Sequence, residues 1–241
     1  EAAFPSIHSA FPLLYAMKSP FALCTPFLPL LVISNDGLLL PYEYQQRAMN
    51  KVFEEVNMSQ VERFSTGLPP NRICEWQSHQ FRAVFKCIDG FLVDFRWMYV
   101  SRLGNVGISF LPNTITNVEI TACHQTSIVN TRYFPRDARS ICYAYNSMRG
   151  SLDLRVLSDH LINLNLRSNE FTGPIDLQYL PRTLHTLILT TNSIDQKVVY
   201  YGNLPKAIDE IDLGGNAIRS VQCVAGDRRY VWKGIRDSKI Y

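Results

Sequence analysis

The sequence has little of what catalytic and metal sites require. Its five histidines are scattered and show no metal-ligand spacing. It contains no Gly-rich phosphate loop, no G-x-S-x-G motif and no H-E-x-x-H motif. We therefore expect no enzymatic activity, no cofactor and no metal site.

Charge and cysteine are also sparse. The formal net charge of +3 is too small to indicate a polyanionic partner. Six cysteines in 241 residues do not indicate a disulfide scaffold. With 46% hydrophobic residues, the chain is expected to fold around a sizeable apolar core instead.

What the sequence does contain is a repeat of 23 or 24 residues. The stretch from Leu161 to Leu177, LINLNLRSNEFTGPIDL, follows the pattern L-x-x-L-x-L-x-x-N-x-L. No single turn of this kind can bury its own apolar edge, so successive turns are expected to stack into a solenoid. Six consecutive units share the register, and they begin at Leu92, Ile115, Ala138, Leu161, Leu184 and Ile208.

Four of the six units place an asparagine where an apolar residue is otherwise expected. The two preceding apolar positions alternate as they do on a strand with one buried face. A buried amide without a partner costs roughly 1–3 kcal/mol, so we expect these side chains to bond the backbone of neighbouring turns. The positions of this predicted asparagine ladder are Cys123, Asn146, Asn169, Asn192 and Asn216, with a structural thiol standing in for the first amide. The outer half of each unit is short and contains Gly or Pro, which predicts extended or 3₁₀ segments there.

These units resemble leucine-rich repeat proteins. Segments such as FTGPIDLQYLPRTLHTLILTTN, with G-x-(I/L)-D-L and a closing Leu-Pro, are similar to kinetoplastid-type leucine-rich repeats. Plant-type repeats are similar too, but usually carry Pro where Asp153 and Asp176 stand. The resemblance implies a solenoid over residues 92–220 with a parallel β-sheet on its concave face.

An N-terminal cap is expected over residues 41–91. PYEYQQRAMNKVFEEV, from Pro41 to Val56, is predicted to be a helix because Tyr44, Ala48 and Val52 recur at four-residue steps. Asn57-Met58-Ser59 then matches the short acceptor pattern for N-glycosylation.

A C-x-W motif and a second cysteine precede the first repeat. With the helix, they resemble the N-terminal cap of secreted and plant-receptor-type leucine-rich repeat proteins. That resemblance implies a disulfide between Cys74 and Cys87, with Trp76 packed over the first turn.

The two ends of the chain differ from the repeats. Residues 1–40 form a Pro/Phe-rich hydrophobic arm, expected to cover the cap or a partner because so much apolar surface is not left in water. Its prolines and Lys18 argue against a membrane span. In residues 221–241 we expect a C-terminal cap, with an edge strand at 221–224 and a returning strand at 230–232 forming a strand or hairpin. The alternative for residues 228–241 is a basic, aromatic tail that contacts RNA or an acidic protein.

The repeat register predicts which side chains face outward from the strands. Their central column is Arg96, Glu119, Cys142, Asn165, Ile188 and Asp212. The face has no Lys/Arg stripe and no carboxylate cluster, and it resembles a protein-contact surface. The sequence supplies no base beside Cys142, so we do not expect a nucleophile there. The expected partner-binding residues are Arg96, Met98, Tyr99, Glu119, Tyr145, Asn165, Arg167, Ile188 and Asp212.

Two functions follow from these observations. The first is a non-enzymatic module that binds a protein or peptide through its strand face. The alternative is a structural subunit of a larger multiprotein or ribonucleoprotein assembly, anchored by the arm and the tail. The compartment stays open: the cap and the glycosylation motif favour a secreted or cell-surface protein, whereas the unpaired Cys24, Cys142 and Cys223 favour an intracellular assembly.

Overall fold

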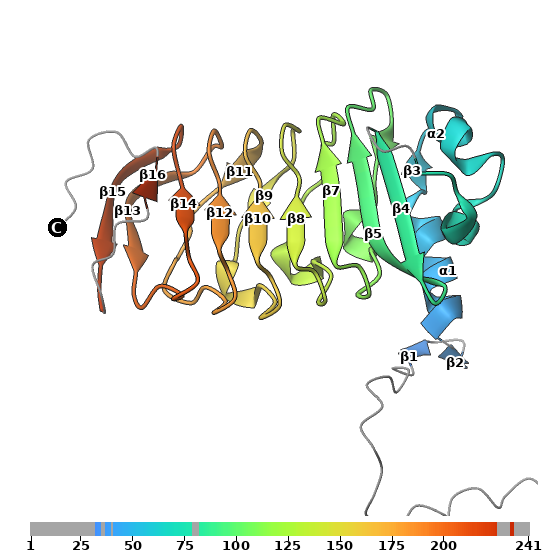
Figure 1. Cartoon of the computed structure of the whole chain (residues 1–241). Helices are drawn as coiled ribbons and strands as arrows, with labels where there is room; N and C mark the ends of the chain where they lie inside the picture. Colours follow the sequence, from blue (N-terminus) through green and yellow to red (C-terminus); the bar gives the residue numbers. More distant parts are fainter. Residues whose placement is uncertain (1–31, 35–36, 40, 79–81, 226–231, 234–241) are drawn as a thin grey trace, which may run out of the picture.

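The computed structural model describes residues 32–34, 37–39, 41–78, 82–225 and 232–233 (Figure 1). These residues form an N-terminal cap followed by a β-solenoid of stacked turns. Most of the arm and most of the tail lie outside the described residues, and what we expect of them stays a prediction. No helix within the described ranges combines the length and the apolar character that crossing a membrane requires.

One sheet of eight strands lines the concave face and runs the length of the solenoid (Figure 1). All neighbours in it are parallel except β4, which pairs antiparallel with β5 at the N-terminal end. The strands, in spatial order, are β4 (Ala83–Ile88), β5 (Phe91–Met98), β7 (Asn117–Thr121), β8 (Ser140–Cys142), β10 (Asn163–Asn165), β12 (Thr186–Ile188), β14 (Glu210–Asp212) and β16 (Trp232–Lys233).

The strand register is the one that the repeat predicts. Arg96 stands opposite Glu119, and Glu119 opposite Cys142. The same column continues through Asn165, Ile188 and Asp212. A slip of one residue would have turned the leucines outward, so the buried face holds every strand in this register.

The outer half of each turn is extended or 3₁₀, as expected. Two short parallel pairs lie along the outer side: β9 (Arg149–Ser151) with β11 (Glu170–Thr172), and β13 (Asp195–Tyr201) with β15 (Ala217–Cys223). The 3₁₀ turns are η2 (Ile108–Phe110), η3 (Thr131–Tyr133) and η4 (Leu154–Val156).

The cap differs from expectation in the length of its first helix. Helix α1 (Pro41–Val52) ends before Val56, because β3 (Glu55–Val56) becomes extended and pairs antiparallel with β6 (Gly104–Asn105) in the first turn. Tyr44, which we predicted to face the core, is 37% exposed. The cap also contains α2 (Met58–Ser65) and η1 (Pro70–Glu75). Before it, at the end of the arm, β1 (Val32–Ser34) pairs with β2 (Gly37–Leu39).

At the other end, β15 (Ala217–Cys223) covers most of the expected edge strand, whereas most of the expected returning strand lies outside the described residues. The edge strand is the end of β15, which begins inside the last repeat at Ala217. The returning segment contains β16, which pairs parallel with β14 and so adds one more strand to the concave sheet. The solenoid therefore continues past residue 220 within the described residues.

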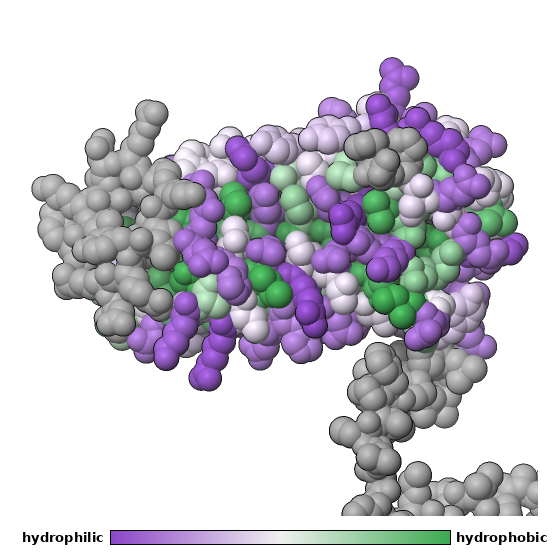
Figure 2. Space-filling view, in the orientation of Figure 1, coloured by the Kyte–Doolittle hydropathy of each residue, from purple (hydrophilic) through white to green (hydrophobic). Residues whose placement is uncertain are grey.

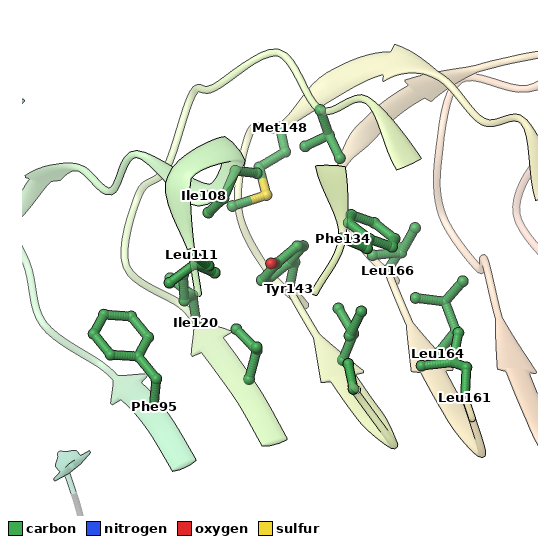
Figure 3. Close-up of a cluster of buried hydrophobic side chains, with 14 of the residues drawn as sticks. Phe95, Ile108, Leu111, Ile120, Phe134, Tyr143, Met148, Leu161, Leu164 and Leu166 are labelled. Atoms are coloured by element: carbon green, nitrogen blue, oxygen red, sulfur yellow. The ribbon is translucent and has the colours of Figure 1, made fainter. Parts of the chain in front are cut away.

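The core is one continuous column of apolar side chains between the two faces. Figure 3 shows Phe95 of β5, Ile120 of β7, Tyr143 directly after β8, and Leu164 of β10 lying along it. At the N-terminal end, aromatic rings of the cap seal the column: Trp97 packs edge-on against Phe85, with ring centroids 5.0 Å apart.

Candidate partner-binding face

The asparagine ladder fixes the backbone from which the candidate face projects. Asn169 Nδ2 donates to the Tyr143 carbonyl of the preceding turn at 2.8 Å, and its Oδ1 accepts from Met148 N at 3.0 Å. The same side chain also donates to two carbonyls of its own turn. Equivalent bonds between turns are made by Asn146, Asn192 and Asn216. These side chains hold each strand at a set distance from the next.

Cys123 occupies the same slot but cannot make these bonds. Its thiol donates to the carbonyl of Thr121 in its own turn, at 3.3 Å. The bonds to the preceding turn come from Gln125, which is fully buried. Its Oε1 accepts from Val106 N at 2.7 Å, and its Nε2 donates to Gly104 O at 2.7 Å. Sequence reasoning missed Gln125, since a single glutamine gives no periodic signal.

In each of the six repeat units, the residue just before the ladder position has left-handed backbone and lies one to three residues after the concave strand. The six φ values lie between 52° and 70°, and five of the six residues are not glycine. The left-handed conformation costs a residue with a Cβ about 1–2 kcal/mol, and here the bonds between turns maintain it. The residues of this column are Tyr99, Ala122, Tyr145, Ser168, Thr191 and Gly215.

Two tyrosines in this column project into solvent, and we call them the tyrosine pair. Tyr99 is 64% exposed and Tyr145 is 49% exposed. With strands about 4.8 Å apart, two steps along the column separate their backbones by about 10 Å. The small side chain of Ala122 lies between them in the column, so the two rings have no bulky neighbour from that turn.

Arg167 lies beside the tyrosine pair, one turn after Tyr145. Its guanidinium carbon is 5.0 Å from the centre of the Tyr145 ring, which is the geometry of a cation–π contact. Within the described part of the chain, no carboxylate forms an ion pair with Arg167. The side chain thus braces the ring and presents a positive charge to solvent.

Arg96 is held differently from what a free anchor requires. Its Nε and Nη2 bond both oxygens of Asp94 on the same strand, at 2.7 and 2.6 Å. Asp94 is 7% exposed, and its hydrogen bonds to Arg96 raise the pKa of the guanidinium above the ordinary value. Because residues two apart on a strand face the same side, the sequence did contain a signal for this pair. Arg96 neutralises a buried carboxylate, so its role includes the fold.

The other expected contact residues are spread along the face. Met98 stands next to Tyr99 at the end of β5, whereas Asp212 belongs to β14, near the opposite end of the sheet. Glu119, Asn165 and Ile188 are half-buried members of the central column. The face shown in Figure 2 mixes hydrophilic and hydrophobic residues and has no uniform stripe. The structure thus places Met98 next to Tyr99 and Arg167 against Tyr145. The other expected contact residues are neighbours in the central column of the sheet.

In the cap, Cys74 and Cys87 form a disulfide. Trp76 is 5% exposed and packs edge-on against Phe53 of the cap and Phe85 of β4, with ring centroids 5.0 and 5.4 Å apart. It therefore reaches the first turn through these two rings, both of which contact Phe95.

A shallow recess lies near the end of α1, away from the tyrosine pair. It measures about 310 Å³, and Phe110 and Ile128 at its lining are 49% and 72% exposed. Its polar lining includes Glu54, which is paired with Lys51. Across the described ranges, no three His, Cys, Asp or Glu side chains gather into a metal site.

Comparisons with known proteins concern the fold. No family model and no curated protein sequence matches this chain. Among solved structures, it is similar to the crystal structure of the BIR3–SERK2 complex from Arabidopsis thaliana, at 13% identity and a TM-score of 0.49, over 72% of this chain and 93% of that chain. It is also similar to a pollen receptor kinase 3, at 14% identity and a TM-score of 0.43, over 62% and 80%. The leucine-rich repeat architecture rests on the strand register and the asparagine ladder described above.

Proposed function

We propose that this protein is a non-enzymatic module that binds a protein or peptide partner through the N-terminal part of its strand face. The observation that carries the proposal is the tyrosine pair, two exposed aromatic side chains held on strained backbone at the end of the sheet. Glycine or asparagine meets the left-handed conformation at lower cost, so two tyrosines there favour a role for the side chains.

The chemistry around the pair suits recognition of a partner. Tyrosine supplies a large rigid contact surface with a polar tip, and it is enriched at interface hot spots together with arginine. Met98 adds an adaptable apolar contact beside Tyr99. Arg167 adds a positive charge, so the partner is expected to present an apolar side chain to the rings and a carboxylate nearby.

Replacement of both tyrosines by alanine tests this proposal. Tyr99→Ala with Tyr145→Ala should remove two anchors, and a hot-spot side chain contributes about 2 kcal/mol or more. We expect the Kd for a purified partner to rise roughly 30-fold or more, as measured by calorimetric titration. The partner is first obtained by affinity capture from the cells that produce the protein, with quantitative mass spectrometry.

The matched control is a pair of exposed tyrosines on the outer side. Tyr133 and Tyr179 are 57% and 64% exposed and lie outside the strand face. Their double replacement by alanine should leave both capture and the melting temperature unchanged. Equal loss of binding in the two double variants, or none in the first, would rule out the tyrosine pair as the contact. Arg96 is unsuitable as a probe, because its removal leaves the Asp94 carboxylate unpaired.

The assembly-subunit alternative depends on the arm and the tail. Most of both segments lies outside the described residues, and no observation on the described part favours that alternative. The resemblance to kinetoplastid-type repeats and to the caps of secreted proteins likewise stays a prediction about origin and compartment.

A further inference from the structure

Asn57 occupies an exposed and well-defined position in the cap. It is the N-cap residue of α2, where its Oδ1 accepts hydrogen bonds from Ser59 N at 3.2 Å and Ser59 Oγ at 2.7 Å. Its backbone N–H donates to Leu103 O of the first turn at 2.7 Å. The backbone is thus anchored on the solenoid while the side chain remains exposed.

The two ends of the Asn57 carboxamide have different surroundings. The oxygen makes the capping bonds, whereas the structure gives Nδ2 no hydrogen-bond partner within the described residues. Asn57-Met58-Ser59 is also the only Asn-x-Ser/Thr sequence in the chain. The four ladder asparagines, by contrast, use Nδ2 between turns and carry no such motif.

We propose that Asn57 is a modification site that carries an N-linked glycan. In the transfer, a bond forms between Nδ2 and the anomeric carbon of a lipid-linked oligosaccharyl diphosphate. The bond from that carbon to the diphosphate oxygen breaks, the lipid diphosphate leaves, and Nδ2 loses one proton. Oδ1 takes no part in the new bond, so the glycosylated residue keeps both capping interactions.

A second feature of the same cap points to the compartment where this reaction occurs. Cys74 and Cys87 form a disulfide, and such bonds persist in oxidising compartments such as the secretory route. Helix α2 also lies beyond the β4 end of the concave sheet (Figure 1). A glycan at the start of α2 is therefore attached to the cap and not to a strand of the concave sheet.

The test is made on the full chain purified from the cells that produce it. Digestion with trypsin isolates residues 52–63, which contain Asn57 and no other asparagine. We expect this peptide to carry hexose and N-acetylhexosamine masses. An N-glycosidase in heavy-oxygen water should remove them and convert Asn57 to a labelled aspartate. The peptides containing Cys74 and Cys87 are read in the same sample without reduction.

Two variants separate the glycan from the fold. Asn57→Asp keeps a capping oxygen, and it is identical in sequence to the enzymatically deglycosylated protein. Ser59→Ala keeps Asn57 but destroys the acceptor motif. Both should migrate as the deglycosylated wild type does, and Asn57→Asp should share its melting temperature. A native chain with unmodified Asn57 overturns the proposal, whether its cap cysteines are joined or free.

Discussion

The first two turns of the solenoid and the four that follow use different side chains to bond the backbone of the preceding turn. In the later turns an asparagine at a fixed position bonds both its own turn and the one before, as Asn169 does to Tyr143 O and Met148 N. In the first two turns that position is apolar or a thiol, Val100 and Cys123. There Gln125 bonds the preceding turn from two residues further along the chain. Each junction between two of the six turns therefore contains a carboxamide side chain.

The cap shows the same solution once more. Gln45 of α1 is 4% exposed, accepts from Leu92 N at 2.7 Å and donates to Gly90 O at 2.9 Å. A carboxamide can donate and accept at once, so one side chain satisfies both kinds of backbone group that a turn leaves unpaired. Every junction from the cap to the sixth turn thus contains a carboxamide side chain, and four of these six side chains are asparagines of the repeat.

The largest loss of stability is expected when a ladder asparagine is removed. Asn169→Ala removes bonds to three carbonyls and one N–H, all in a nearly dry interior. Met148 N loses its only partner, whereas Tyr143 O, Leu166 O and Arg167 O each keep a second donor. Four hydrogen bonds at about 1 kcal/mol each give an expected loss of about 4 kcal/mol in the free energy of unfolding, measured by urea denaturation. Asn165→Ala in the same turn is the matched control. Asn165 is half-buried on the strand face, and its Oδ1 accepts from Arg167 N. A similar loss in both variants would contradict the ladder.

The second prediction concerns Gln125, whose carboxamide takes the role of a ladder asparagine at the junction of the first two turns. Gln125→Ala should cost about 3 kcal/mol, because three backbone groups lose their partner: Val106 N, Gly104 O and Cys123 O. The damage should be confined to the N-terminal turns, which amide hydrogen exchange resolves residue by residue. Gln178→Ala is the control, since this half-buried glutamine bonds Asp176 alone. If Gln125→Ala lowered the protection from hydrogen exchange evenly along the solenoid, the junction of the first two turns would not be a local site of stability.

The parts that sequence predicted are those that a period encodes. The repeat predicted the strands, the ladder and the outward columns, because only one strand register buries the leucine of every turn. What it missed depends on single, distant contacts. Helix α1 ends at Val52 because β3 pairs with residues about fifty positions later. Gln125 bonds Val106 N and Gly104 O of the preceding turn, whereas the Cys123 thiol donates within its own turn.

The sequence predicted which residues lie on the candidate face, but not their backbone conformation or their side-chain partners. The register placed Tyr99 and Tyr145 beside the outward columns, yet nothing in a spacing pattern indicates a left-handed φ. For Arg96 the sequence held the information, since Asp94 precedes it by two residues on the same strand. We expect Arg96 to bind a partner, and the structure pairs it with a carboxylate that is almost fully buried.

The smallest expected effect is a pH dependence of stability that the Cys123 thiol causes and the ladder asparagines do not. Burial raises the pKa of the Cys123 thiol to about 11 from 9.0, although the backbone of Val100 and Tyr99 partly opposes the shift. The folded state then holds this proton more tightly than the unfolded state does. Its contribution to stability is complete below about pH 9 and is lost as the pH rises towards 11. We expect wild type to lose about 2 kcal/mol relative to Cys123→Ala between pH 8 and about pH 10.5. Other alkaline titrations, such as that of Tyr143, are common to both proteins and cancel in the difference. Asn169→Ala removes no titrating group, so its difference from wild type should stay constant over the same range. A constant difference for Cys123→Ala as well would mean that the thiol is solvated, and that the second turn lacks the dry junction on which the role of Gln125 depends.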